Sequence, residues 1–267
     1  MSTPAHCIEK PDLSIVMPCY NEEAILGFTI PKLVQAFERS EYRLELIAVD
    51  NVSLDRTGEI IRRFQGKYPA VVFHRVEQNQ GYGWGILSGM QLCSAEWVGI
   101  VPADGQVDAE DVVLLFETAL ASDGRVLAKV RRRFRMDGVT RKIVSVGFNA
   151  LIRVLWPRLE SIDVNGTPKI LPRRVMQAMK LRSKDWFLDA EMMVKAHHMG
   201  LRVLEVNVFA RLRGNGLSHV RPSTCWQFLQ RLVQFRLSRS WQTDVHPLPA
   251  DAVTMRGALE SGPESCS

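Results

Sequence analysis

The chain has 267 residues, 46% of them hydrophobic, and a net charge of +5 at pH 7, which allows one sizeable core without requiring two domains. No apolar run reaches the roughly 18 residues that a membrane-spanning helix needs, and the N-terminal segment lacks the basic and apolar regions typical of a secretory signal. The five cysteines are scattered without CxxC spacing, which argues against a disulfide framework or a zinc site and favours a cytoplasmic location.

The N-terminal half alternates between short apolar runs and helical patterns. The runs are β-branched or continuously apolar, as expected of strands that are buried on both faces. This alternation predicts crossover units, and hence an α/β fold with a mostly parallel sheet and helices on both faces. The predicted strands cover residues 13–18, 44–50, 71–76 and 96–102, and the predicted helices cover 22–39, 56–65, 84–93 and 109–121.

The C-terminal half is less regular. Its predicted strands are 126–130 and 201–208, and its predicted helices are 143–156, 186–200 and 222–241. The last helix carries arginines between its apolar positions, so it either packs on the domain or lies at a membrane interface. The predicted organisation is a leader at 1–11, one domain at 12–220, an amphipathic helix at 221–241 and a disordered tail at 242–267.

A basic segment lies between residues 125 and 142, where eight basic side chains accompany one acid, Asp137. A solvated helix or loop face would explain such a run without any function. A concentrated positive patch also suits phosphate, whether on a nucleotide, a lipid or a nucleic acid. The basic residues are Arg125, Lys129, Arg131, Arg132, Arg133, Arg135, Arg141 and Lys142.

Polar residues follow three of the four predicted strands in the N-terminal half. Residues 18–22 end the first strand, Asp50 and Asn51 end the second, and Asp104 follows the fourth. Ligands of open parallel sheets bind beyond the carboxyl ends of the strands, which meet at one edge. We therefore expect these groups to gather at one site, and their chemistry suits a nucleotide.

Asp104 allows two interpretations. Asp108 and Asp111 are typical of a helix N-cap and a first-turn acid, and they need no further role. Asp104 and Gln106 lie before that cap, where a hard cation such as Mg²⁺ or Mn²⁺ could share their oxygens with substrate phosphates. Position alone leaves open whether Asp104 binds a metal.

Four segments in this order resemble the motifs of the family 2 glycosyltransferases, which have the GT-A fold: IVMPCYNEE, AVDNVSLDRTGEI, NQGYGWGILSGM and VPADGQVDAED. Within that family the chain is similar to the dolichol- or polyprenyl-phosphate sugar synthases, over residues 13–220. The resemblance implies an inverting enzyme that moves a sugar from a nucleotide-diphosphate sugar to a polyprenyl phosphate or to a hydroxyl group. It also implies Mg²⁺ or Mn²⁺ as cofactor, no nucleic-acid partner, and a place in the cytoplasm or on the cytoplasmic face of a membrane.

The resemblance assigns residues to the donor. Asp50 would contact the nucleoside, and Asp104 would bind the metal with Gln106 as a companion ligand. The turn that contains Gly81 and Gly83 would let the backbone approach the nucleotide. The base and ribose pocket would be lined by Pro18, Tyr20, Asn21 and Glu22.

On the acceptor side, the resemblance implies that Asp189 acts as a base or positions the acceptor. A solvated acid on the surface of a helix would explain the same residue without any function. Glu191, two residues further along the same helix, should not share its face. The segment RLRGNGLSH would close over the diphosphate, with Arg211 or Arg213 offsetting its charge and Ser218 assisting. An acceptor phosphate would be held by Lys129, Arg131 and Arg133.

The sequence departs from the family at several motif positions. Pro102 replaces the first acid of the Asp-x-Asp metal motif, so metal binding would rest more on the diphosphate. Asn51 and Val52 replace the second acid and the glycine of the usual Asp-Asp-Gly-Ser stretch. His219 stands where a lysine is common.

Two other functions fit single features of the sequence. The GYGWG segment suggests a nicotinamide-dependent oxidoreductase, but it follows the third strand and lacks the acid expected about 20 residues further on. A non-catalytic binder of nucleic acid or of a membrane surface would explain the basic segment. It would leave the polar groups at the strand ends without a role.

Overall fold

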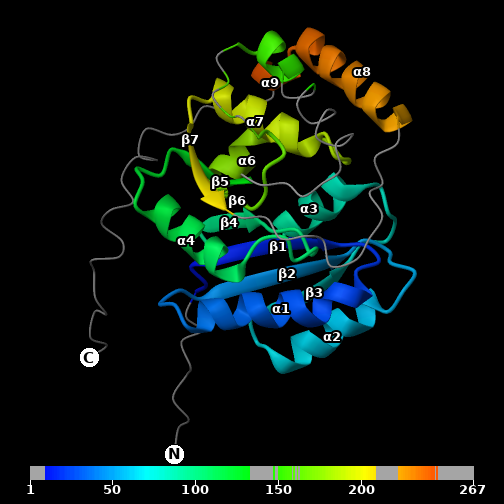
Figure 1. Ribbon diagram of the computed structural model, residues 1–267, viewed down its shortest axis with the longest axis vertical. Helices are drawn as coiled ribbons and strands as arrows, with labels where there is room; N and C mark the ends of the chain where they lie inside the picture. The colour runs from blue at the N-terminus through cyan, green and yellow to red at the C-terminus, as the bar shows by residue number, and fades with distance from the viewer. Residues whose placement is uncertain are drawn as a thin grey trace, which may run out of the picture.

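The computed structural model describes residues 10–132, 147, 150–157, 159, 161, 163–208, 222–243 and 245. Seven strands form one sheet in the order β3-β2-β1-β4-β6-β5-β7 (Figure 1). β6 runs antiparallel to β4 and β5, and the other neighbours are parallel, so the predicted mostly parallel sheet is confirmed. The strands are β1 (Leu13–Cys19), β2 (Leu44–Asp50), β3 (Val71–Arg75), β4 (Trp97–Ile100), β5 (Val126–Arg132), β6 (Lys169–Pro172) and β7 (Arg202–Val208).

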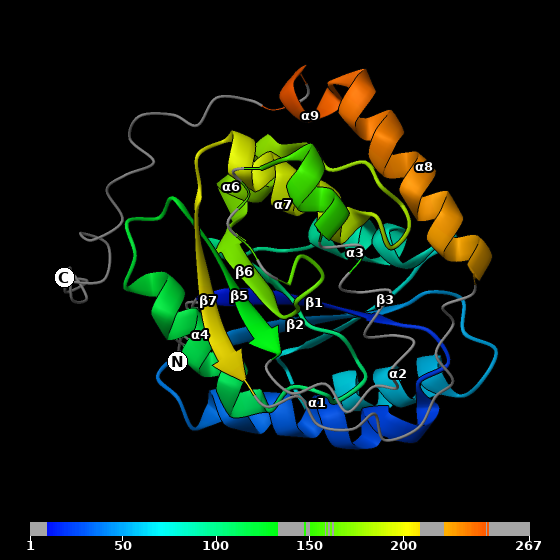
Figure 2. The same ribbon diagram turned by 45° about the horizontal axis from the view of Figure 1, so that its top comes forward.

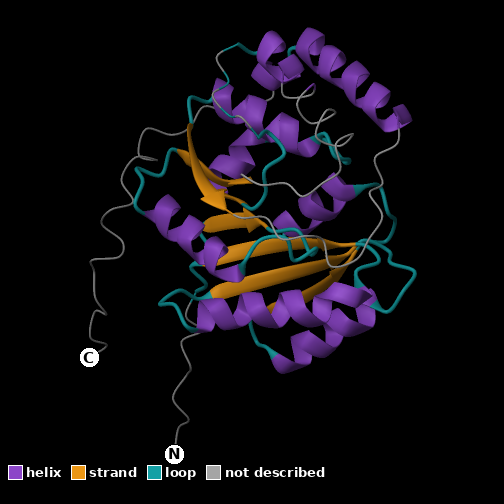
Figure 3. Ribbon diagram, viewed as in Figure 1, coloured by secondary structure: helices purple, strands orange, loops and turns teal. Residues whose placement is uncertain are grey.

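Helices cover both faces of the sheet, as predicted (Figures 1 and 2). One face packs on α1 (Glu23–Glu38), α2 (Thr57–Lys67) and α4 (Ala109–Leu120). The opposite face packs on α3 (Tyr82–Met90), α6 (Arg173–Met179) and α7 (Leu188–His198). Figure 3 shows the strands as a single twisted layer between these helices. The last two elements are α8 (Pro222–Ser238) and α9 (Ser240–Thr243).

The central strands are mostly apolar because each face contributes to a separate core. In β1, Ile15 and Met17 belong to the cluster on the α1 face, whereas Val16 belongs to the cluster on the α3 face. All three side chains are fully buried. A strand that is covered on both sides has no solvent-facing positions, which removes the alternation seen in half-exposed strands.

The sheet register aligns the strand ends at one edge. Cys19, the last residue of β1, lies beside Asp50 of β2, and Asp50 lies beside Arg75 of β3. On the other side of β1, Val16 pairs with Ile100, the last residue of β4. The chain therefore leaves β1, β2, β3 and β4 at the same edge, which is where the candidate site lies.

The structure adds two elements that the sequence pattern did not predict, β6 and α6. β6 has only four residues, begins with Lys169 and ends with Pro172, and so resembles neither an alternating nor a continuously apolar strand. α6 follows it directly and has only seven residues. Short elements of this kind depend on their neighbours in space, here β4 and β5, rather than on their own pattern.

The predicted C-terminal helix is two helices in the structure. α8 ends at Ser238, and Arg239, with φ of 54°, separates it from α9. Leu232 of α8 is buried against the α3-face core, whereas Leu237 is 76% exposed. Of the helices that the structure describes, none combines the length and the apolar character needed to cross a membrane.

Candidate functional site

Hydrogen bonds connect the loop that follows β1 to the loop that follows β2. The N–H of Asn21 donates to Ser53 Oγ (3.1 Å), and the N–H of Leu54 donates to Asn21 Oδ1 (2.8 Å). The N–H of Glu22 donates to Thr57 Oγ1 (2.8 Å). The amide oxygen of Asn21 is thus used inside the protein, which leaves its NH₂ group for the predicted contact with a nucleoside.

Asp55 fixes the start of α1 and of α2. Its carboxylate accepts the N–H of Glu23 (3.1 Å) and the N–H of Thr57 (3.0 Å). Burial alone would raise the pKa of this carboxyl, but the hydrogen bonds, including one from the Thr57 hydroxyl, outweigh burial and lower its pKa. Asp55 is therefore an ionised acid that shapes the loop.

Two further residues that are predicted to bind the sugar donor, Pro18 and Tyr20, lie at the end of β1. The Tyr20 side chain is 43% exposed, so an aromatic ring is available at the edge of the sheet. Pro18 is partly buried next to Gly85 of α3. Both positions are compatible with the predicted base and ribose pocket.

Asp50 lies between the ends of β1 and β3, and its side chain is fully buried. Arg75 Nη1 donates to Asp50 Oδ2 (2.6 Å), and the N–H of Ser53 donates to Asp50 Oδ1 (2.9 Å). The Arg75 side chain is 42% exposed, so its charge reaches the surface. Sequence reasoning missed Arg75, although a charged residue at the end of the third predicted strand was a usable signal.

Asn51 offers an unused hydrogen-bond acceptor. Its Nδ2 donates to the carbonyl of Gly81 (3.0 Å), which fixes the orientation of the amide because the flipped form would set two oxygens face to face. Its Oδ1 is buried and receives no hydrogen bond from the residues that the structure describes. Leaving a buried acceptor unsatisfied is costly, so an ordered water molecule or a donor group of a ligand is the expected partner.

Val52 occupies a backbone conformation that disfavours its side chain. Its φ is 61°, in the left-handed region where β-branched residues are outliers. The turn is held from both sides, by the N–H of Asn51 on Cys19 O (2.9 Å) and by the N–H of Ser53 on Asp50. The chain therefore keeps a turn suited to glycine although the glycine is absent.

We expect the variant Val52→Gly to be more stable than Val52→Ala by about 1 kcal/mol, because only glycine relieves the left-handed strain. At an ordinary position the order is reversed, since glycine costs about 0.5–1 kcal/mol relative to alanine. Urea unfolding of the two variants measures the difference. A more stable alanine variant would mean that the turn does not hold residue 52 in this conformation.

Gly81 and Gly83 are needed by the protein's own packing. A Cβ at Gly81 would lie 2.5 Å from the carbonyl oxygen of Lys184, and one at Gly83 would lie 2.4 Å from the carbonyl oxygen of Ser183. The N–H of Trp84 also donates to Lys184 O (2.9 Å). The 183–185 segment therefore explains both glycines by packing, and the approach of this backbone to a nucleotide stays a prediction.

Asp104 lies in a turn after β4. Its Oδ1 accepts the N–H of Gln106 (3.2 Å), and both residues are partly exposed. Within the described part of the chain, no group of three or more His, Cys, Asp or Glu residues comes together as a metal site. A carboxylate and an amide oxygen fit a hard cation only if the substrate supplies further oxygens, which agrees with the loss of the first acid at Pro102.

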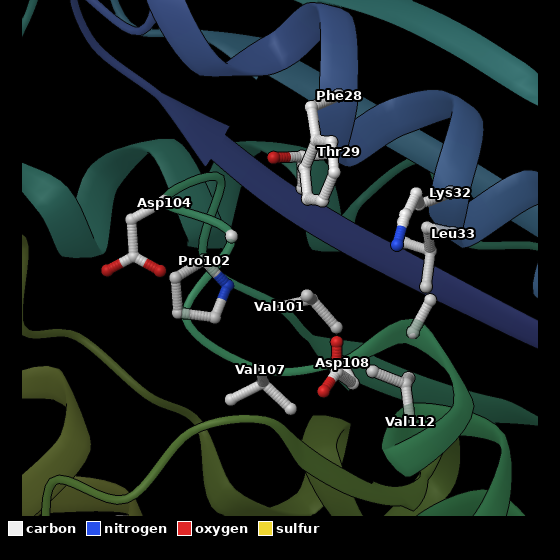
Figure 4. Close-up of a pocket in the computed structure, with 12 residues that line it drawn as sticks. Phe28, Thr29, Lys32, Leu33, Val101, Pro102, Asp104, Val107, Asp108 and Val112 are labelled. Atoms are coloured by element: carbon white, nitrogen blue, oxygen red, sulfur yellow. The ribbon is translucent and has the colours of Figure 1, made fainter. Parts of the chain in front are cut away.

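A pocket opens on the α1 side of this turn (Figure 4). In this view Asp104 lies at one end and Lys32 at the other. Asp104 alone of the predicted site residues lines the pocket, so this hollow is distinct from the expected nucleoside site. The pocket is lined by Phe28, Thr29, Lys32, Leu33, Val101, Pro102, Asp104, Gly105, Val107, Asp108, Ala109 and Val112.

Asp189 and Glu191 point to different partners, as predicted from their spacing. Asp189 Oδ1 accepts a hydrogen bond from Lys169 Nζ, and the Asp189 side chain is 9% exposed. Glu191 pairs with Lys195 (2.7 Å) and accepts backbone N–H groups of Arg182 and Ser183. Asp189 is not a solvated acid, and sequence reasoning missed Lys169, for which the pattern carried no signal.

Lys129 does not offer its charge to an acceptor phosphate. Its side chain is fully buried, and its Nζ donates to Ser161 Oγ (3.1 Å), Glu205 Oε1 (3.2 Å) and the carbonyl of Asp163. Burial, and secondarily the charge of Lys169, lowers the pKa of Lys129 to about 8. The prediction for Lys129 is wrong in this geometry because a phosphate cannot reach the ammonium group.

Arg131, the next predicted phosphate ligand on β5, is partly exposed and remains a candidate. The other predicted residues of the diphosphate and the acceptor lie outside the described residues. They are Arg133, Arg211, Arg213 and Ser218.

The family model of glycosyl transferase family 2 matches residues 14–187. The dolichol-phosphate mannosyltransferase of Pyrococcus furiosus is 24% identical over 238 residues, which cover 87% of this chain and 65% of that protein. The dolichyl-phosphate beta-glucosyltransferase ALG5D of Trichomonas vaginalis is 26% identical over 224 residues, which cover 75% of this chain and 66% of that protein. The chain thus spans less than two thirds of the length of these two relatives.

A solved structure has the same fold. It is glucosyl-3-phosphoglycerate synthase from Mycobacterium tuberculosis in complex with Mn²⁺, uridine diphosphate and phosphoglyceric acid. The TM-score is 0.65 at 19% identity, and the match covers 87% of this chain and 79% of that chain.

Proposed function

Because this chain belongs to glycosyl transferase family 2, we propose that it transfers a sugar from a nucleotide-diphosphate sugar to a polyprenyl phosphate, with inversion at the anomeric carbon. The observation that carries the proposal is the gathering of Asp50, Asn51 and Asp104 at the edge where β1, β2 and β4 end. The names of the two relatives, which refer to dolichol phosphate and dolichyl phosphate, support the choice of acceptor.

The nucleoside would lie between the loop after β1 and the start of α3. Tyr20 supplies an exposed ring for the base, and the buried Oδ1 of Asn51 supplies an acceptor for a ligand N–H or O–H. Asp50 and Arg75 form an ion pair at the border of this part of the site. The carboxylate is buried and fixed by the pair, and the guanidinium reaches the surface. These groups bind and orient the donor without taking part in bond breaking.

The diphosphate would lie next to Asp104, with Gln106 as a second oxygen ligand of a divalent cation. Bound Mg²⁺ or Mn²⁺ offsets the negative charge that develops on the departing diphosphate. The structural neighbour was solved with Mn²⁺ and uridine diphosphate together, which supports this cofactor class. Arg211 or Arg213 would add positive charge from the segment after β7.

The acceptor would approach from the side of α7, where Asp189 lies. A phosphate acceptor is already ionised, so it needs orientation rather than a strong base. A hydroxyl acceptor would need Asp189 to accept its proton, and the nearly buried position of Asp189 favours this second candidate function. In both cases the nucleophile forms a bond to the anomeric carbon while the bond between that carbon and the diphosphate oxygen breaks, and the nucleoside diphosphate leaves.

The proposal predicts selective stabilisation by one sugar nucleotide. Thermal unfolding is measured with UDP-, GDP- and TDP-sugars, each with and without Mn²⁺. One nucleotide is expected to raise the stability, by about 2.7 kcal/mol at a concentration of 100 times its Kd, and to do so only with the metal. The labelled sugar of that nucleotide should then be recovered on polyprenyl phosphate in the organic phase.

Two results would contradict the proposal in different ways. No stabilisation by any sugar nucleotide would refute the donor class. Transfer to a hydroxyl-bearing acceptor, with polyprenyl phosphate left unmodified, would leave the donor class intact and replace the acceptor.

A further inference from the structure

A row of charged side chains crosses the sheet on the face that packs on α7. In the sheet register Lys169 of β6 lies beside Ile100 of β4, and also beside Lys129 of β5. Lys129 in turn lies beside Glu205 of β7. Because Ile100 is the last residue of β4, the row lies at the edge from which the chain continues to Asp104.

The row places two cations next to each other inside the protein. The side chains of Lys129 and Lys169 are both fully buried. Like charges on neighbouring strands are destabilising, and buried ion pairs are often no better for stability than apolar side chains of the same size. Stability therefore does not explain why two lysines stand here, at the edge of the site.

The two lysines are neutralised differently. Lys129 has three acceptors, a hydroxyl, a carbonyl and the carboxylate of Glu205, as expected of a buried cation that is held for structure. Lys169 donates only to Asp189 among the residues that the structure describes. Among the described residues, the carboxylate of Asp189 is thus the one side-chain partner of the Lys169 ammonium group.

Asp189 is the outer member of its pair. Its side chain is 9% exposed and that of Lys169 is fully buried. Lys169 binds Oδ1, and no described residue donates to Oδ2. By contrast, both oxygens of Glu191 are occupied by backbone N–H groups and Lys195, which makes that neighbouring acid structural.

We infer that Lys169 is a positioning residue of the transfer reaction, which holds Asp189 through Oδ1 so that Oδ2 is presented to the acceptor. The inference rests on the second form of the proposed function, transfer to a hydroxyl group whose proton Asp189 would accept, because a carboxylate oxygen would repel an ionised phosphate. Lys169 does not touch the substrate. It fixes the charge and the direction of a carboxylate that otherwise has two rotatable bonds and an exposed end.

The test compares Lys169→Met with Lys129→Met. Each variant removes one buried lysine from the same row, but only the first removes the partner of Asp189. Lys169→Met is expected to lower kcat about 10- to 100-fold, the usual range for groups that orient a functional residue, with an unchanged KM for the donor. Lys129→Met is expected to keep kcat within about threefold of the wild type, at temperatures where both variants are folded by circular dichroism.

A double-mutant cycle separates positioning from a general structural effect. If Lys169 acts through Asp189, Lys169→Met should lower kcat no further in the Asp189→Asn background. Lys169→Arg, which keeps the charge, should recover part of the loss.

The outcomes are distinguishable. Wild-type turnover by folded Lys169→Met, or additive losses in the cycle, would overturn the inference and leave the proposed function standing. Equal losses in Lys169→Met and Lys129→Met would also overturn it, since they would indicate a structural role for the whole row. A wild-type protein that transfers no sugar from any donor would refute the proposed function, and this inference with it.

Discussion

Asp104→Ala is expected to lower kcat by about 10²–10³-fold, the usual loss when one group that stabilises developing negative charge is removed. The reason is specific to this chain. Pro102 occupies the position of the first acid of the motif, so Asp104 is the one carboxylate among residues 101–107, which lie between β4 and Asp108, the N-cap residue of α4. Initial rates at saturating sugar nucleotide, with Mn²⁺ varied, measure the effect.

Glu110→Ala is the matched control for Asp104→Ala. Glu110 lies six residues further on and forms an exposed ion pair with Arg39, in which both side chains are 64% exposed. Exposed pairs contribute about 0–1 kcal/mol to stability, so this variant should keep wild-type turnover and metal dependence. Full activity of Asp104→Ala, or of the wild type in excess chelator, would refute the metal role of Asp104.

Glu191→Ala is expected to destabilise the protein by about 3–5 kcal/mol, the usual cost of breaking a buried ion pair. Glu191 and Lys195 are 3% and 1% exposed, so the substitution leaves a buried ammonium group without its carboxylate. It also removes the acceptor of the N–H groups of Arg182 and Ser183. Their segment packs against Gly81 and Gly83, so the start of α3 loses its support as well.

Urea unfolding measures this loss, and two variants serve as controls. Glu191→Gln keeps the shape and an acceptor oxygen, so it should lose less stability than Glu191→Ala. Glu117→Ala removes an exposed glutamate from α4 and should change stability by no more than about 0.5 kcal/mol. A loss below about 1 kcal/mol in Glu191→Ala would show that this ion pair does not hold the 182–185 segment.

The fold was predictable where the pattern is local. Strands that are buried on both faces, such as residues 44–50, are short and mostly apolar runs between turns, and β2 begins and ends as predicted. β6 could not be found in this way, because a four-residue strand that begins with Lys169 depends on pairing with β4 and β5. The break between α8 and α9 was also missed, since Arg239 has no sequence signal for its left-handed backbone.

The candidate site was predictable in location but less so in detail. The order of the strand ends placed Asp50 and Asp104 at one edge before the register was known. What each side chain contacts depends on segments far away in the sequence. The glycines at 81 and 83 face the 183–185 segment, and Lys129 faces Glu205, and neither contact is indicated by the local sequence.

The central claim is that Asp104 holds a divalent cation against the diphosphate of a sugar donor. A crystal structure with a nucleoside diphosphate and Mn²⁺, recorded with anomalous scattering from manganese, tests it most directly. We predict one manganese peak within coordination distance of the Asp104 carboxylate and of diphosphate oxygens, at the edge where β1, β2 and β4 end. A nucleotide bound there without manganese, or manganese bound away from Asp104, would contradict the account.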